Sequence, residues 1–435
     1  MNAPRGSVCV VGAGIVGCAT AYALARDGWQ VTLVDAAAQP GQGASLANGA
    51  QLSYSYVEPL ATPAALRALP GWLLKADSPL RWRPRPDVDH LRWLAAFVRA
   101  CRASQVRDTT AALLVLSFLS RDTLHAWLAE QPGAAARSGH GRPGKLVLYR
   151  DAAARAGVQR QLDAQAALGC RQRVVDRDEC VAIEAALAAD RGAIAFGVWT
   201  DSEEVVDAAR LAQALAQASG ARLRLGEKAL GFEQRDGRLH ALRLQDDVIA
   251  AAHFVVATGA GAATLLRPLG LHLPIEPIKG YSITVPVVDA TAAPRVSVTD
   301  TARKLVYARL GDRLRVAGFA ELVGADRRIA PARIEALCDA VRQTFPGACD
   351  LREPAAWAGL RPATPDGRPR VGATRFPNLW INAGQGALGL TLAAGSAALL
   401  ARLMARAEPG IDPRPYAPDA EACPSSARAP QATAA

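Results

Sequence analysis

The stretch that most constrains the fold lies near the start of the chain, between residues 8 and 35. Four small apolar residues at 8–11 predict a buried strand, and three glycines at GxGxxG spacing then open a helix that continues to Arg26. Gly28 ends this helix, and residues 30–34 predict a second strand with Asp35 at its tip. This order of elements predicts a Rossmann-like α/β unit.

The glycine spacing is typical of a dinucleotide site. Gly12 permits a tight turn, Gly14 lets the backbone approach a pyrophosphate, and Gly17 lets the helix pack closely against the strand. The positive end of the helix dipole then faces the phosphates. Asp35 stands where a carboxylate can accept hydrogen bonds from ribose hydroxyls. The alternative, a glycine-rich turn in an empty domain, leaves Asp35 without a role.

Composition narrows the class of partner. The chain has 435 residues, half of them apolar, which is enough for two or three domains. The net charge is +10, but only five residues are lysine and the arginines form no long run, which argues against nucleic-acid binding. The eight cysteines include no CxxC pair, which predicts a reducing, cytoplasmic compartment without disulfides or a metal site.

Two uncharged segments imitate export or membrane signals. Residues 8–25 resemble a signal peptide, but cleavage there would destroy the glycine turn. Residues 379–401 are long enough to span a bilayer, but Gly384, Gly386 and Gly389 crowd the first half of the segment. We therefore predict a strand, a glycine loop and a helix at 379–401.

Between these ends the sequence predicts helices and strands of a further layer. Helices are expected at 109–131, 152–168, 207–220 and 333–345, strands at 222–225, 239–244, 281–288, 303–310 and 313–320, and a loop at 132–145. Residues 66–102 interleave Trp72, Trp82, Trp93 and Phe97 with eight basic side chains. This segment suits a lipid headgroup surface, or a helix with buried aromatics and solvated arginines, and we favour the second.

Three separate segments carry glycines at the end of an apolar strand: 8–17, 253–261 and 379–391. A simple nicotinamide-nucleotide domain needs only the first of them. The other two indicate a longer, extended cofactor such as FAD, whose flavin end needs a second backbone element to hold it.

At this point the sequence resembles the FAD-dependent D-amino acid oxidase superfamily, and within it the bacterial D-amino acid dehydrogenases of the small-subunit type. The motifs that carry the resemblance occur in family order at 8–35, 45–53, 277–282, 357–367 and 382–389. The resemblance implies an α/β fold with a discontinuous FAD-binding Rossmann-like domain at 1–60, 197–270 and 357–415. An α+β substrate domain on a mostly antiparallel sheet would occupy 61–196 and 271–356, and 416–435 would be a disordered tail.

The resemblance also assigns residues to the cofactor. The expected FAD contacts are Gly12, Ala13, Gly14, Ile15, Val16, Gly17, Asp35, Ser45, Asn48, Gly49, Gln51, Ala229, Ala257, Gly259, Gly384, Gly386, Ala387, Leu388, Gly389 and Thr391. The segment from Gly384 to Thr391 matches the loop and helix start that face the flavin ring in this family.

Three residues are expected to act on the substrate. Arg361 matches the arginine that grips the amino-acid carboxylate, a role that suits a bidentate guanidinium. Tyr281 is a weaker candidate for a hydrogen bond to the same carboxylate. A purely structural role, with the ring packed in the sheet, explains this tyrosine nearly as well. Gln385 replaces a histidine of close relatives in the flavin-facing loop, which places the substrate preference in question.

The implied reaction is hydride transfer from Cα of a D-amino acid to flavin N5, followed by hydrolysis to a 2-oxo acid and ammonia. No histidine falls in a motif, so no general base is assigned. Some oxidases of the superfamily place a lysine over the flavin, and the matching strand here has Val316 at about that position. This favours electron transfer to a quinone or another respiratory acceptor.

The sequence leaves three questions open. A peripheral contact of 66–102 with the inner face of the cytoplasmic membrane is compatible with it. The substrate could be a cyclic imino acid or another secondary amine instead of a D-amino acid. An alternative outside the enzymes is a noncatalytic flavoprotein subunit that needs a partner to work.

Overall fold

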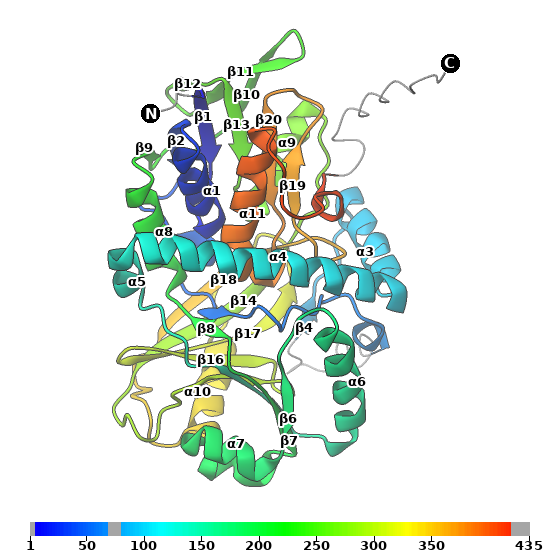
Figure 1. Cartoon of the computed structure of the whole chain (residues 1–435), viewed down its shortest axis with the longest axis vertical. Helices are drawn as coiled ribbons and strands as arrows, with labels where there is room; N and C mark the ends of the chain where they lie inside the picture. Colours follow the sequence, from blue (N-terminus) through cyan, green and yellow to red (C-terminus); the bar gives the residue numbers. More distant parts are fainter. Residues whose placement is uncertain (1–4, 68–79, 419–435) are drawn as a thin grey trace.

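The computed structural model describes residues 5–67 and 80–418, and its upper layer is a six-stranded sheet (Figure 1). Over these residues the strand order is β19-β20-β13-β1-β2-β9. The bounds are β1 Ser7–Val11, β2 Gln30–Asp35, β9 Arg222–Leu225, β13 His253–Val256, β19 Arg370–Ala373 and β20 Leu379–Ala383. All neighbours are parallel except β19 and β20. The sheet therefore gathers the three distant glycine segments.

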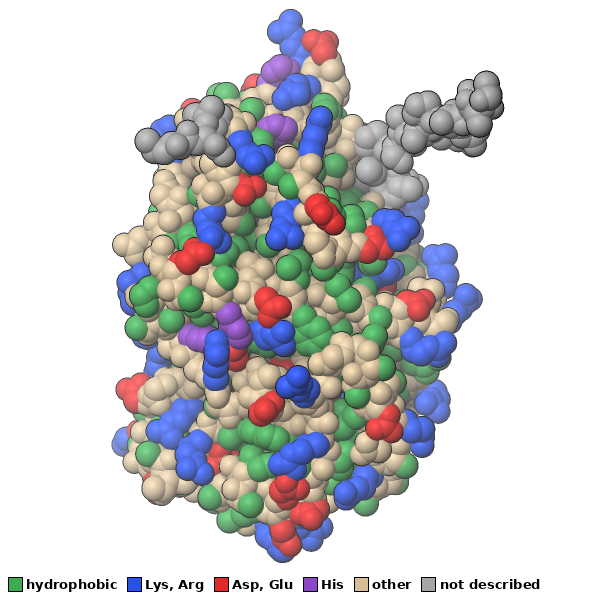
Figure 2. All heavy atoms as spheres, in the orientation of Figure 1, with side chains coloured by type: hydrophobic (Ala, Val, Ile, Leu, Met, Phe, Trp, Pro, Cys, Tyr) green, Lys and Arg blue, Asp and Glu red, His purple; other side chains and the backbone are tan. Residues whose placement is uncertain are grey.

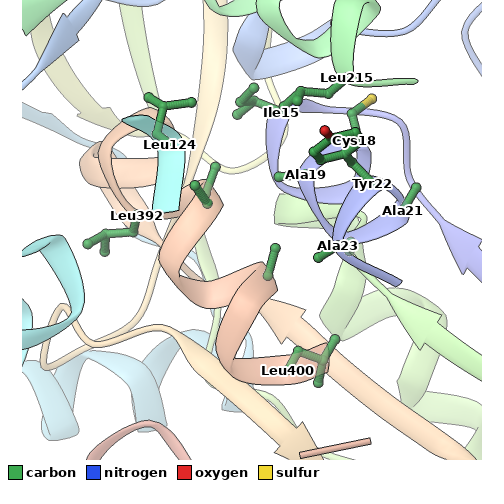
Figure 3. Packing of buried hydrophobic residues seen from close by; sticks show 14 of the residues in the cluster. Ile15, Cys18, Ala19, Ala21, Tyr22, Ala23, Leu124, Leu215, Leu392 and Leu400 are labelled. Atoms are coloured by element: carbon green, nitrogen blue, oxygen red, sulfur yellow. The ribbon is translucent and has the colours of Figure 1, made fainter. Parts of the chain in front are cut away.

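Four helices cover one face of this sheet. They are α1 (Ile15–Arg26), α8 (Ala208–Ala218), α11 (Gly389–Met404) and α4 (Ala103–Glu130), which crosses over α11 (Figure 1). Ile15 and Tyr22 of α1 share a buried cluster with Leu392 and Leu400 of α11 (Figure 3). A Cβ on Gly395 would lie 2.7 Å from the Leu116 carbonyl oxygen, so α11 and α4 pack at backbone distance.

The strand, loop and helix predicted at 379–401 are confirmed. Among the described residues, one helical segment, Gly386–Met404, is long and apolar enough to cross a membrane, and 67% of its most apolar window is buried inside the protein. It is therefore packed as a core helix. Helix α8 is also confirmed, with Asp207 accepting hydrogen bonds from the backbone N–H groups of Ala209 and Arg210.

The opposite face of the first sheet carries a smaller layer. This layer consists of a three-stranded antiparallel sheet, β10 (Gly231–Arg235), β11 (Arg238–Arg243) and β12 (Val248–Ala250), and the short helix α9 (Ala262–Leu266). Its apolar side chains pack on Cys9, Val11 and Phe254. The first sheet is thus covered on both faces, as a parallel sheet requires.

The lower layer is a second, mostly antiparallel sheet with the order β18-β14-β17-β16-β15-β5-β7-β6, and β4 pairs with β17. The bounds are β4 Leu80–Trp82, β5 Lys145–Tyr149, β6 Arg173–Val175, β7 Phe196–Thr200, β14 Glu276–Pro286, β15 Ser297–Asp300, β16 Leu305–Leu310, β17 Arg313–Leu322 and β18 Ala355–Ala363. Helices α7 (Arg177–Ile183) and α10 (Pro331–Thr344) cover one face, and α6 (Arg155–Ala166) covers part of the other. The predicted fold class is confirmed.

The structure differs from the sequence prediction in three details. The predicted boundaries at 197 and 357 fall inside β7 and β18, so both of these strands belong to the second sheet. The loop predicted at 132–145 is wrong in its first half, because α5 occupies Pro132–Ser138 between a proline start and a left-handed Gly139. The predicted tail begins too early: Tyr416 is buried and its hydroxyl donates to the Ala112 carbonyl at 2.6 Å. Residues 419–435 lie outside the described residues.

The tryptophan- and arginine-rich segment forms helix α3 (Val88–Ala100) in its second half. Trp93 and Phe97 are buried and stack at 5.2 Å between ring centroids, so the favoured interpretation of inward aromatics is confirmed for them. Trp72 lies outside the described residues. The outer face of α3 exposes Val88, Leu91 and Val98.

Positive side chains are scattered over the visible face of the molecule and interleaved with acidic ones (Figure 2). Many arginines form ion pairs with a nearby carboxylate, often two to four residues away, such as Arg328 with Asp326 and Arg342 with Asp339. The net charge of +10 is therefore not gathered into a stripe on this face.

One buried ion pair joins the ends of β5 and β15. Asp300 is fully buried and accepts hydrogen bonds from Arg150 at 2.7 Å and Arg303 at 2.9 Å. Burial acts to raise the pKa of Asp300, but the hydrogen bonds from both arginines outweigh it and hold the pKa below its usual value.

We expect Asp300→Asn to destabilise the protein by about 2 kcal/mol, because Arg150 and Arg303 lose the buried carboxylate that they share and keep only Asp190, which Arg150 contacts at 2.6 Å. A carboxyl with a lowered folded-state pKa stabilises above its unfolded pKa of about 3.9, and this contribution is lost as the pH falls further. The wild-type protein should therefore lose stability below about pH 4, and the variant should lose less over that range. Urea unfolding at pH 7 and pH 3 measures both effects. Asp350→Asn, at an exposed ion pair, is the control and should unfold like the wild type.

Candidate active site

A cavity of about 1290 Å³ opens between the two sheets. At one end its wall is formed by the glycine turns after β1 and β13, and at the other by β14, β17 and β18. A single cavity therefore joins the predicted dinucleotide turn to Arg361.

The glycine turn after β1 is built by steric exclusion. Gly12 has a φ of +107°, and a Cβ there would lie 2.6 Å from the Ala257 carbonyl oxygen. A Cβ on Gly17 would lie 1.7 Å from the Gly12 carbonyl oxygen, so α1 can pack on the turn only without a side chain. Gly17 and Ala13 do not line the cavity, and their role is to shape the turn.

The N-terminus of α1 faces the cavity. Gly14, Ile15 and Val16 line it, and the first turn contains no acidic residue. Ser45 accepts a hydrogen bond from the Ile15 N–H at 3.0 Å, which brings the loop after β2 against the helix end. The positive end of this dipole remains available to an anionic group.

Asp35 lines the cavity, but its carboxylate also holds the turn. Its Oδ2 accepts from the Ala13 N–H at 2.6 Å, and its Oδ1 accepts from the Ala37 N–H at 2.8 Å. Each carboxylate oxygen can accept a further hydrogen bond. The contact of Asp35 with ribose stays a prediction. The structure adds a second role for this carboxylate, which is to hold the backbone of the glycine turn in place.

The loop at 45–51 also lines the cavity, but two of its side chains face the protein. Asn48 accepts from the Ala50 N–H at 3.0 Å. The Gln51 amide donates to the carbonyl oxygens of Val298 and Tyr307 at 3.2 and 3.3 Å. The Gln51 amide fixes the loop to β15 and β16, and the Asn48 amide braces the loop itself, so a contact with FAD would have to come from other atoms of the loop.

The two other glycine segments complete this part of the wall. The remaining predicted residues on the cavity wall are Gly49, Ala229, Ala257, Gly259, Gly386, Ala387, Leu388, Gly389 and Thr391. Gly384 does not line the cavity: its φ of +84° turns the chain beside Thr364. Thr258 also lines the cavity, and its buried hydroxyl has no hydrogen-bond partner in the described structure.

Arg361 projects from β18 across β14. A Cβ on Gly280 would lie 2.5–2.7 Å from the guanidinium atoms, so glycine provides the space that Arg361 fills. Its Nη1 donates to the Phe319 carbonyl at 2.7 Å, and Phe319 has a φ of +62° at an irregular register of β17. Strain at Phe319 thus aims a carbonyl at Arg361.

No carboxylate among the described residues forms an ion pair with Arg361, although the side chain lines the cavity. Burial lowers the pKa of Arg361, yet a guanidinium stays protonated. A buried cation without a counter-ion is costly, so the site is prepared for an anionic ligand.

Tyr281 lines the same end of the cavity, but its hydroxyl is engaged elsewhere. It donates to Glu321 at 2.9 Å, and Glu321 also pairs with Arg333 at 3.0 Å and Lys279 at 3.3 Å. Burial and Glu321 raise the pKa of Tyr281, while Lys279 opposes them. The Tyr281 hydroxyl proton is already donated to Glu321, so it is not available for the expected hydrogen bond to a substrate carboxylate. Tyr281 therefore contributes its aromatic ring to the cavity wall.

Gln385 is buried on the cavity wall, and its Nε2 donates to the Asn382 side chain at 2.7 Å. A backbone bridge joins it to Ala363, two residues beyond Arg361. Gln385 therefore ties the start of α11 to the strand of Arg361.

The sequence analysis placed Val316 at about the position over the flavin where some oxidases carry a lysine, and this placement is wrong. Val316 is fully buried in the core of the second sheet, and its neighbour Ala317 lines the cavity instead. Alternation along β17 decides this, because successive side chains point to opposite faces.

Sequence reasoning missed several charged or aromatic residues on the wall, among them Tyr56, Glu58, Lys145 and Lys304. Lys145 had a detectable signal, because it begins the apolar run of β5 at a position that alternates with Val147 and Tyr149. The others lie in loops without periodicity.

The geometry agrees with the comparisons to known proteins. Residues 7–403 match the family model "DAO: FAD dependent oxidoreductase". The chain belongs to this family. The resemblance and the FAD cofactor expected from the sequence are thereby confirmed, and the long cavity and the α1 terminus fit that cofactor.

Two curated relatives of this FAD-dependent oxidoreductase are named "D-amino acid dehydrogenase 2". The protein of Ralstonia nicotianae is 48% identical over 94% of this chain and 99% of its own length. That of Pseudomonas aeruginosa is 44% identical over 93% of this chain and 96% of its own. Among solved structures, glycine oxidase from Geobacillus kaustophilus has a TM-score of 0.74 at 22% identity, covering 96% of this chain and 99% of its own, which shows the shared fold.

We expect Gly280→Ala to lower kcat/KM about 100-fold, because the new methyl group would displace the Arg361 guanidinium and a misplacement of about 1 Å can cost this much. Steady-state kinetics with D-alanine measure the effect, which should appear mainly in KM. Gly192→Ala adds a methyl group where no atom lies within 4 Å and should leave the kinetics unchanged. An active Gly280→Ala enzyme with an unaltered KM would contradict this placement of Arg361.

Proposed function

We propose that this protein catalyses the FAD-dependent oxidation of D-amino acids to 2-oxo acids and ammonia. The observation that carries the proposal is the guanidinium of Arg361, which has no carboxylate partner within the described part of the chain and lies in the same cavity as the dinucleotide turn. The names of the two curated relatives support the D configuration and the amino-acid class.

In this proposal Arg361 binds the substrate carboxylate, and the Phe319 carbonyl and the gap at Gly280 hold the guanidinium in place. The Tyr281 ring, fixed through Glu321, forms a wall beside it. FAD, when bound, supplies the two-electron oxidation of the substrate. The protein contributes position and charge, and no residue of the site has to act as a base if the amine enters unprotonated.

We further propose that a quinone or another respiratory carrier, rather than oxygen, takes up the electrons. The relatives are named dehydrogenases, which supports this choice.

The outer face of α3 supports a peripheral contact with the inner face of the cytoplasmic membrane. On it, exposed Val88, Leu91 and Val98 lie at helical spacing beside Arg92 and Arg99. Flotation with anionic vesicles tests the contact: the wild type should float, and Leu91→Glu should reduce binding. No binding at low salt would contradict it.

An anaerobic titration tests the reaction. D-Alanine should bleach the flavin absorbance and L-alanine should not, and a soluble quinone should restore the colour faster than air. Bleaching by a cyclic imino acid alone would assign the substrate to secondary amines. No bleaching by any amino acid would point to a noncatalytic flavoprotein subunit.

A further inference from the structure

A buried lysine that no step above uses lies on the cavity wall. Lys145 begins β5, and its side chain is 2% exposed. Its Nζ donates to Ser53 Oγ at 2.7 Å and lies 4.4 Å from the centre of the Tyr56 ring. An ammonium has three donors, and among the described residues Lys145 uses one of them, in the hydrogen bond to Ser53. Lys145 therefore has donors and charge to offer the cavity.

Hydrogen bonds place Lys145 at the Arg361 end of the cavity rather than at the Gly12 end. The Ser53 N–H donates to Thr391 Oγ1 at 3.1 Å, and Thr391 belongs to the first turn of α11. The loop before α11 is bridged through Gln385 to the strand of Arg361. Lys145 is thus one residue removed from the helix start that the family motif places against the flavin ring.

The counter-charge of Lys145 lies behind it. Glu203 is 1% exposed and does not line the cavity, whereas Lys145 does. One Glu203 oxygen accepts from the Ser55 N–H at 2.8 Å, and the other has no hydrogen-bond partner among the described residues. The buried pair is therefore oriented with its positive end toward the cavity.

Lys145 keeps most of its charge at neutral pH. Burial lowers the pKa of Lys145 to about 8, and the charge of Glu203 acts against this shift. Burial raises the pKa of Glu203, and Lys145 opposes the rise. At neutral pH the ammonium is mostly protonated.

We propose that Lys145 is an electrostatic positioning residue that stabilises negative charge on the flavin ring and so raises the reduction potential of bound FAD. Reduction adds negative charge to the ring, and a nearby cation in a site of low dielectric constant favours the reduced form. Glu203 acts in the opposite direction from a greater distance. The inference rests on FAD binding, which the family establishes, and is independent of which substrate is oxidised.

The test measures the potential and the affinity for sulfite, an anion whose addition to the ring also places negative charge there. In Lys145→Met holoenzyme we expect the dissociation constant of sulfite to rise at least tenfold. We expect the equilibrium with a reference dye to shift tenfold toward oxidised flavin, which corresponds to about 30 mV for a two-electron couple. Lys145→Arg should restore most of both values.

Two further variants separate charge at this position from general effects. Lys228→Met removes the same charge from an exposed lysine beside Ala229, at the opposite end of the cavity, and should change neither value. Glu203→Gln removes the opposing charge and also the support that this charge gives to the protonation of Lys145. Measured at a pH at which Lys145 is still protonated in the variant, sulfite binding should tighten several-fold. A purely structural role of the pair predicts no such change of sign.

The outcomes decide the inference independently of the substrate. An unchanged potential and sulfite affinity in a folded, FAD-loaded Lys145→Met protein would overturn it. If that variant does not fold, Glu203→Gln decides, and unchanged or weaker sulfite binding would overturn it. If D-alanine fails to reduce the enzyme but the sulfite shifts appear, the proposed reaction fails and the role of Lys145 stands.

Discussion

Replacing Arg361 by methionine should lower kcat/KM for D-alanine about 100-fold or more while FAD remains bound. The guanidinium is the cation that β18 places at this end of the cavity, and among the described residues it donates a hydrogen bond to the Phe319 carbonyl oxygen and forms no ion pair. A charge-assisted bond to the substrate carboxylate in a desolvated site contributes about 3 kcal/mol, which corresponds to a factor of more than 100.

The variant also tests binding without turnover. A small carboxylate such as benzoate should perturb the flavin spectrum of the wild type and fail to do so in Arg361→Met at the same concentration. Arg361→Lys keeps the charge but loses the fork of donors, so its activity should lie between the two. If kcat/KM stays within about threefold of the wild type, Arg361 is not the carboxylate ligand.

The second large effect concerns the glycine turn, where alanine at Gly14 and alanine at Gly17 should impair different properties of the protein. Gly17→Ala should destabilise the apoprotein by about 3 kcal/mol, because its Cβ would lie 1.7 Å from the Gly12 carbonyl oxygen. Gly14→Ala should leave the apoprotein nearly unchanged, because its Cβ would meet Ser45 Oγ at an ordinary 3.5 Å. Gly14 lines the cavity, so the methyl group should instead weaken FAD binding at least about tenfold.

Thermal unfolding of the apoproteins and fluorescence titration with FAD separate these two effects. Gly28→Ala is the matched control, because Gly28 has a φ of +87° but no atom within 4 Å of its Cβ and lies away from the cavity. It should cost about 1 kcal/mol of stability from backbone strain and leave the FAD affinity unchanged. Equal FAD affinities for Gly14→Ala and the wild type would remove Gly14 from the pyrophosphate site.

The amino-acid sequence alone was enough to predict those features of this protein that depend on residues close together in the chain. In the turn at 12–17, a backbone carbonyl oxygen occupies the place of the missing side chain at Gly12 and at Gly17, and the glycine spacing in the sequence already predicts this exclusion. The apolar runs that precede the glycine segments likewise predict parallel strands of a sheet that is covered on both faces. Arg361, which the sequence motif singled out, lies on the wall of the cavity.

Tertiary structure decided which groups on a side chain are free. Tyr281 and Gln51 reach the cavity wall, but their polar atoms are taken by Glu321 and by carbonyls of β15 and β16, partners up to 256 residues away in sequence. Val316 turned inward because of the register of β17 against β14 and β16. Lys145 and Glu203 became a pair only when β5 met the loop at 53–56. Hydrogen bonds and charges act over a few ångströms in space, so a single sequence cannot specify them until the fold brings distant segments together.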